Sequence, residues 1–133
     1  YVDPSGLDAD NVSSAFDYSR LIAYAASLDT LGPIMRTPEY DVRTPTREFA
    51  IHSTNRLLTT AVGNEVLGAK TGFISKAGYC LATLLQMPQG SRVAVVVLGA
   101  ATSTTRFNEA LNLFNWIRGK SQGIDGGDPL PIF

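Results

Sequence analysis

The residues of this chain best suited to chemistry are three neighbours, Lys70, Thr71 and Gly72. Lys70 offers a compact positive charge that can stabilise an anionic group. Thr71 offers a hydroxyl that can donate a hydrogen bond to a carboxylate or carbonyl oxygen. Gly72 lacks a Cβ, so another backbone can approach it closely. The triplet therefore has the groups needed to hold a ligand beside the strand that follows it.

The sequence shows no motif for an activated serine nucleophile. Each serine is followed three residues later by something other than lysine, so the chain contains no Ser-x-x-Lys. The single histidine, His52, excludes a multi-histidine metal site, and we assign it no role. The single cysteine, Cys80, excludes an internal disulfide, and its place in an apolar strand is typical of a small hydrophobe.

Composition indicates one modest globular domain of 133 residues, with 44% hydrophobic and 17% charged residues. A net charge of −1 and the lack of a basic cluster argue against a nucleic-acid partner. No apolar run approaches the roughly 18 residues of a membrane span.

The elements that must position the triplet follow from periodicity and turn residues. Apolar residues at helical spacing predict a helix over 15–28 and a final helix after residues 102–105. Ser13 or Ser14 is the expected cap of the first helix, with Asp17 three residues after Ser14. A short helix over 30–36, small strands over 40–44 and 47–51, and a buried hairpin over 73–86 or 78–86 with 92–98 are expected between them. This order predicts an α+β fold with helices packed on an antiparallel sheet.

Longer matches surround the triplet. They are residues 3–7 (Asp-Pro-Ser-Gly-Leu), 11–14 (Asn-Val-Ser-Ser), 53–58 (Ser-Thr-Asn-Arg-Leu-Leu), 70–73 (Lys-Thr-Gly-Phe) and 77–81 (Ala-Gly-Tyr-Cys-Leu). In this order and spacing the chain resembles the later half of a D-alanyl-D-alanine carboxypeptidase or endopeptidase, a low-molecular-mass penicillin-binding protein. The resemblance runs from Tyr1 to about Arg118.

The resemblance implies a β-lactamase/transpeptidase-like α+β fold, an antiparallel sheet flanked by helices, with its N-terminal part missing. Residues 1–119 are expected to form the C-terminal portion of the catalytic domain, and residues 120–133 a flexible tail. Ser53-Thr54-Asn55 fits Ser-x-Asn, but in the family that motif lies upstream of Pro-Ser-Gly-Leu. The nucleophilic serine, its lysine base and the second motif are therefore expected before Tyr1.

The implied activity is that of a serine-type D,D-peptidase, in which the serine attacks a D-Ala carbonyl and water releases the acyl-enzyme. Lys70 is the catalytic residue expected in this chain, and it also binds substrate together with Thr71 and Gly72. The backbone N–H of Phe73 is the expected second oxyanion-hole donor, and Arg106 resembles the arginine that meets the substrate's terminal carboxylate.

A plainer interpretation of Arg106 is an early-helix arginine paired with Glu109. The substrate implied is a peptidoglycan stem peptide or its cross-link, β-lactam antibiotics are the implied inhibitors, and no cofactor or metal is implied. The implied location is the cell envelope, periplasmic or otherwise extracytoplasmic. Alternatives are a β-lactamase or esterase of the same fold and a non-catalytic peptidoglycan- or partner-binding domain. The sequence does not separate carboxypeptidase from endopeptidase.

Overall fold

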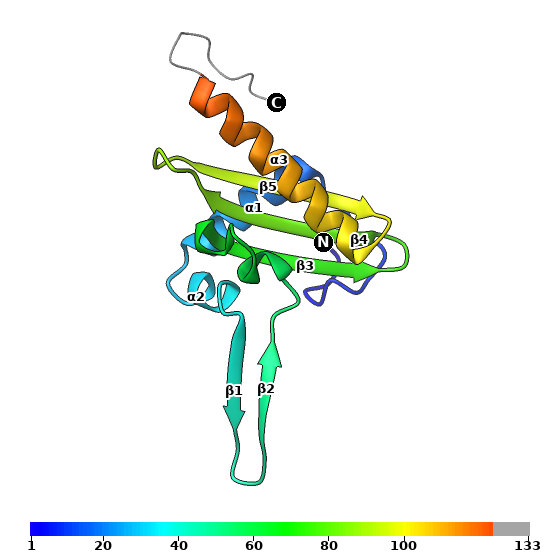
Figure 1. Cartoon of the computed structure of the whole chain (residues 1–133). Helices are drawn as coiled ribbons and strands as arrows, with labels where there is room; N and C mark the ends of the chain where they lie inside the picture. The colour runs from blue at the N-terminus through cyan, green and yellow to red at the C-terminus, as the bar shows by residue number, and fades with distance from the viewer. Residues whose placement is uncertain (124–133) are drawn as a thin grey trace.

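A computed structural model, which describes residues 1–123, places a three-stranded antiparallel sheet between two helices (Figure 1). The sheet has the order β3-β4-β5, and β1 and β2 form a separate hairpin. The elements are helices α1 (Ala15–Ser27), α2 (Leu31–Met35) and α3 (Ser103–Gly123), strands β1 (Glu39–Arg43), β2 (Glu48–His52), β3 (Val66–Ile74), β4 (Gly78–Gln86) and β5 (Arg92–Ala100), and 3₁₀ turns η1 (Arg56–Thr59) and η2 (Gly63–Glu65). The α+β architecture with a flanked antiparallel sheet is as the sequence predicts.

The main core lies between the sheet and α3. Alternate residues of a strand share a face, and Leu81 and Leu85 of β4 are both 1% exposed. Phe107, Ala110 and Phe114 of α3 meet them at helical spacing, and Phe114 is fully buried. The apolar stripe predicted for the last helix is therefore its buried face.

Helix α1 lies against the opposite face of the sheet (Figure 1). The hydroxyl of Ser14 accepts a hydrogen bond of 3.1 Å from the backbone N–H of Asp17, so Ser14, and not Ser13, is the cap among the two residues expected. A Cβ on Gly68 would lie 2.7 Å from the Cβ of Ala26. This close approach fixes β3 against α1 and requires glycine at position 68.

The strand expected from Phe73 or Gly78 to Gln86 is β4, which begins at Gly78, whereas β3, from Val66 to Ile74, was not predicted as a separate strand. Its glycines lower the local preference for a strand, so the pattern of residues 66–72 alone does not predict one. Pairing with β4 and packing on α1 supply the missing stability. The triplet thus lies inside an edge strand, and β4 pairs with only one side of it.

A bulge interrupts the pairing of β4 with β5, where the register shifts between Tyr79 and Leu81. Gly99 in this region has a positive φ of +73°, and Gly78 at the start of β4 has a φ of +70°. A Cβ on Gly78 would lie 3.2 Å from Gly99 and 3.1 Å from the carbonyl oxygen of Ala100. The bulge therefore depends on two glycines packed against each other, one at the start of β4 and one near the end of β5.

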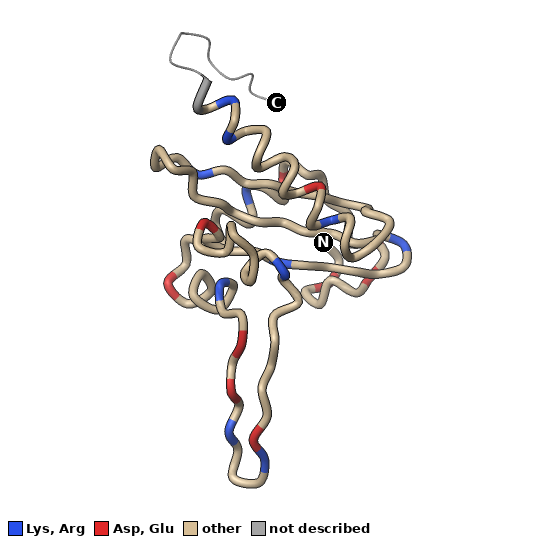
Figure 2. The backbone as a smooth tube through the Cα atoms, in the orientation of Figure 1, with Lys and Arg blue, Asp and Glu red and all other residues tan. Residues whose placement is uncertain are grey.

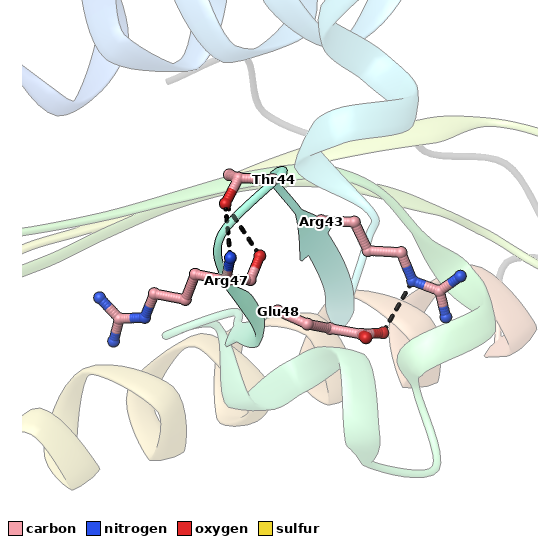
Figure 3. Close-up of polar contacts among 4 residues, drawn as sticks. All are labelled: Arg43, Thr44, Arg47 and Glu48. Atoms are coloured by element: carbon pink, nitrogen blue, oxygen red, sulfur yellow. Dashed lines mark hydrogen bonds and ion pairs between the residues drawn. The ribbon is translucent and has the colours of Figure 1, made fainter.

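The β1–β2 hairpin projects away from the sheet (Figure 1), and acidic and basic residues follow one another along it (Figure 2). Near its tip, Arg43 Nε lies 2.7 Å from Glu48 Oε1, and the Thr44 hydroxyl accepts a 2.9 Å hydrogen bond from the Arg47 N–H (Figure 3). The opposite face carries the exposed side chains of Tyr40, Phe49 and Ile51.

Helix α3 continues to Gly123, beyond the boundary expected at residue 119. The remainder of the expected tail, residues 124–133, lies outside the described residues. Among residues 1–123, no helix has both the length and the apolar character needed to cross a bilayer.

Candidate substrate-binding site

The triplet lines a groove of about 710 Å³ between β3–β4 and the N-terminal segment, residues 1–13. Lys70 and Gly72 lie on the same face of β3 as Gly68, the face that α1 covers, whereas Thr71 lies on the other face. Thr71 still reaches the groove because β3 is an edge strand.

Lys70 is exposed, and its Nζ donates a hydrogen bond to the backbone carbonyl oxygen of Thr71. Gly72 is also exposed, and a Cβ placed on it would meet only the Cβ of Cys80, at an ordinary 3.9 Å. Packing within the chain therefore does not require glycine at this position. Its missing side chain instead leaves the outer edge of β3 open to a ligand backbone.

Arg106, near the start of α3, also lines the groove. It is only 6% exposed, and its Nη1 donates to the carbonyl oxygens of Gly72 at 3.1 Å and Cys80 at 3.2 Å. Its Nη2 donates to the Ser103 hydroxyl at 3.2 Å. The guanidinium thus joins β3, β4 and α3, rather than pairing with Glu109.

Burial lowers the pKa of the Arg106 guanidinium from its ordinary value, while the nearby Cys80 and Tyr79 act in the other direction. An arginine keeps its proton under such conditions, so the group stays cationic. Its Nε is buried and has no hydrogen-bond partner. The site therefore holds a fixed positive charge with unused donor capacity.

Phe73 continues the wall of the groove beyond Gly72. Its ring stacks on that of Tyr79, with 4.3 Å between ring centroids, and the Arg106 guanidinium carbon lies 5.4 Å from the Tyr79 ring centroid. These contacts hold the end of β3 in place. The assignment of the Phe73 backbone N–H to an oxyanion hole remains a prediction.

Thr54 also lines the groove, although the sequence pattern did not predict a role for it. Its Oγ1 lies 2.6 Å from the Oγ1 of Thr71, seventeen residues away. A hydroxyl pair between a loop and a strand leaves no periodic signal in a sequence. The only available clue was that Thr54 lies inside the stretch 53–58 that carries part of the resemblance.

Ser53 and Asn55, the two residues that flank Thr54, stabilise the local structure. Asn55 is 5% exposed, and its Oδ1 accepts a hydrogen bond of 3.2 Å from the N–H of Leu57 at the start of η1. The Ser53 hydroxyl accepts one from the N–H of Asn55. This geometry supports the interpretation that Ser53-Thr54-Asn55 is not the catalytic Ser-x-Asn motif.

Two other residues considered from the sequence differ in their place: His52 lies away from Lys70-Thr71-Gly72, whereas Cys80 is the β4 residue paired with Gly72. His52 Nδ1 lies 3.5 Å from Glu39 Oε2 on the exposed hairpin, away from the groove residues. Cys80 is partly buried and lines the groove, where its thiol points to the carbonyl oxygen of Ala77 at 3.7 Å. Neither arrangement adds a nucleophile to the site.

Comparison with known proteins places this geometry in context. The profile of the D-alanyl-D-alanine carboxypeptidase family matches residues 1–102. A D-alanyl-D-alanine endopeptidase of Pseudomonas aeruginosa is 36% identical over 119 residues, which cover 88% of this chain and 38% of the relative. A D-alanyl-D-alanine endopeptidase of Escherichia coli is 34% identical over 120 residues, with the same coverage of 88% and 38%.

Solved structures show the same fold. A D-alanyl-D-alanine carboxypeptidase from Mycobacterium tuberculosis superposes with a TM-score of 0.75 at 22% identity, covering 90% of this chain and 46% of that one. Penicillin-binding protein D2 from Listeria monocytogenes, in its cefotaxime-bound form, superposes with a TM-score of 0.59 at 27% identity, covering 86% and 46%. The chain spans 38% of the length of the two curated relatives. With the family profile matched over most of its length, the chain belongs to the D-alanyl-D-alanine carboxypeptidase family.

Proposed function

We propose that this chain is the later part of the catalytic domain of a serine-type D,D-peptidase that acts on peptidoglycan peptides. A serine outside this chain would attack the D-Ala carbonyl, expel the leaving amine and form an acyl-enzyme, which water then hydrolyses. This chain supplies the wall along which the peptide lies and the positive charges that face it.

The observation that carries the proposal is the shared groove of Lys70, Thr71, Gly72 and Arg106 beside an edge strand. The open edge at Gly72 lets a peptide add as a further strand. Lys70 stabilises negative charge as it develops on the substrate and assists proton transfer at the serine. The Thr71 hydroxyl and the Arg106 cation hold the substrate's carboxylate.

Cleavage of cross-links is the activity we favour over trimming of terminal D-Ala. Support comes from the two curated relatives, at 36% and 34% identity, which are both named D-alanyl-D-alanine endopeptidases. Peptidoglycan lies outside the cytoplasm, so we place the complete protein in the cell envelope. β-Lactams should inhibit it, as the cefotaxime-bound relative from Listeria monocytogenes suggests.

Digestion of purified peptidoglycan by the complete protein tests this function. We expect loss of cross-linked dimers in a chromatogram of the released muropeptides, and we expect benzylpenicillin to block it. Release of free D-alanine without loss of dimers would indicate a carboxypeptidase. Turnover of nitrocefin without either product would indicate a β-lactamase, and binding to peptidoglycan without product would indicate a non-catalytic domain.

A further inference from the structure

We infer that Thr54 is a positioning residue that orients the hydroxyl of Thr71 toward the substrate, an inference that rests on the proposed function. The two hydroxyl oxygens are 2.6 Å apart, a short distance for a hydrogen bond between neutral hydroxyls. Both residues line the same groove.

The direction of the hydrogen bond follows from what each hydroxyl must do. A hydroxyl has one proton to donate. If Thr71 donated to Thr54, it would have none left for a substrate oxygen. The distance allows either hydroxyl to donate, and the inferred role requires Thr54 to donate to Thr71, so that the proton of Thr71 is directed into the groove. A hydroxyl that accepts one hydrogen bond also becomes a better donor in the next.

Thr54 can perform this role because its loop is held on both sides. The N–H of Ser53 donates to the Pro38 carbonyl oxygen at 2.7 Å, which closes the base of the β1–β2 hairpin. After Thr54, the buried Asn55 caps η1, and Leu57 is 1% exposed.

Arg56 adds a tie to α3, since its Nη1 donates to the Thr104 hydroxyl at 3.4 Å. Thr54 itself is exposed, so its own burial does not account for its position. Its place is set by its neighbours, as expected for a supporting side chain of a preorganised site.

Acylation of the complete protein by a fluorescent penicillin tests the role in the reaction. Thr54→Val keeps the shape but removes the hydroxyl, and should slow acylation by about tenfold, the worth of one hydrogen bond. Thr54→Ser should restore the rate to within about twofold. Thr59→Val is the matched control, because the Thr59 hydroxyl bonds only the local carbonyl oxygen of Arg56, and it should leave the rate unchanged.

The same variants in a Thr71→Val background distinguish positioning from a general loss of structure. Thr54→Val should then have no further effect on acylation, because the hydroxyl that it orients is gone. An undiminished tenfold effect in that background, or equal rates for wild type and Thr54→Val, would overturn the inference. Failure of the wild type to be acylated would instead overturn the proposed function.

If the wild type is not acylated, unfolding stability still tests whether the hydroxyls of Thr54 and Thr71 interact. Urea unfolding of the complete protein with Thr54→Val, Thr71→Val and both together gives the coupling between the two hydroxyls. We expect the unfolding constant to show a coupling of about fivefold, as for a partly exposed hydrogen bond. Strictly additive effects would show that the two hydroxyls do not interact, and would refute the inference.

Discussion

Arg106 shows how a buried cation can be held without a carboxylate partner. Its hydrogen bonds go to two backbone carbonyl oxygens and one hydroxyl, and none of the ion pairs within residues 1–123 involves it. These neutral oxygens accept hydrogen bonds from Nη1 and Nη2 but do not cancel the charge of the guanidinium. The positive field therefore remains available to an anion that enters the groove.

Replacement of Arg106 should distinguish between substrates. In the complete protein, Arg106→Ala should lower kcat/KM for a peptide ending in D-Ala-D-Ala by about 10- to 150-fold, the worth of a charged hydrogen bond. The same peptide with an amidated C-terminus should lose much less, because it has no carboxylate to bind. Arg118→Ala, on the same helix but outside the groove residues, is the control. Equal losses of kcat/KM for both peptides would show that Arg106 supports the fold and does not bind the carboxylate.

The two lysines near the triplet should differ sharply. Lys70 lines the groove, whereas Lys76 forms an exposed ion pair with Asp10 at 3.7 Å. Lys70→Ala should slow acylation by a β-lactam by about a hundredfold or more, as for loss of an oxyanion-stabilising group. Lys76→Ala should change it by less than about twofold, since exposed ion pairs contribute little. Stopped-flow acylation rates make the comparison, and similar rates would contradict the role given to Lys70.

At the scale of the elements, the sequence predicts those with a clear period or cap. Helices α1 and α3, strands β4 and β5 and the β1–β2 hairpin lie within a few residues of their expected positions. Strand β3 was not predicted as a separate strand because Gly68 and Gly72 hide its pattern, while contact with Ala26 holds it in place. A contact between segments forty residues apart is not visible in local sequence.

The candidate site was predictable to a similar degree. Lys70, Thr71 and Gly72 are neighbours in sequence, so their proximity needs no fold. The approach of Arg106 to the groove was expected from the resemblance, but its bonds to the carbonyl oxygens of Gly72 and Cys80 depend on the bulge before α3. The roles of these residues in the reaction remain predictions.

Two glycine-to-alanine changes should have opposite effects on stability. Gly78→Ala places a Cβ against Gly99 and Ala100 at a positive φ, and should lower the free energy of unfolding by about 1–2 kcal/mol. Gly119→Ala lies within α3, has no atom of residues 1–123 within 4 Å of its new Cβ, and should raise the free energy of unfolding by about 1 kcal/mol. Urea unfolding of the 133-residue chain measures both. A Gly78→Ala variant more stable than the wild type would show that the structure accepts a Cβ at position 78, and would contradict the requirement for glycine there.

At the scale of the whole molecule, the chain brings Lys70, Thr71, Gly72 and Arg106 to one groove, but the proposed nucleophile is not among its residues. It contains no Ser-x-x-Lys, and it spans 38% of the length of the two curated relatives. The isolated 133-residue chain should therefore not be labelled by a fluorescent penicillin. Mass spectrometry after incubation checks this, with the complete protein as the positive control. Stoichiometric acylation of any serine of this chain would contradict the expectation.

Strand β5 is the other edge of the sheet, and within residues 1–123 only β4 pairs with it. After Arg92 it carries no charged residue, and Leu98 is 41% exposed. Natural sheets protect such edges with charges, prolines or a covering segment, because an apolar edge is a template for pairing with another copy. In solution, the isolated chain should therefore lose monomer to edge-to-edge aggregates as its concentration rises, and a lysine at Leu98 would act as a gatekeeper against this. The strand that forms one boundary of the sheet would then limit the solubility of the isolated chain.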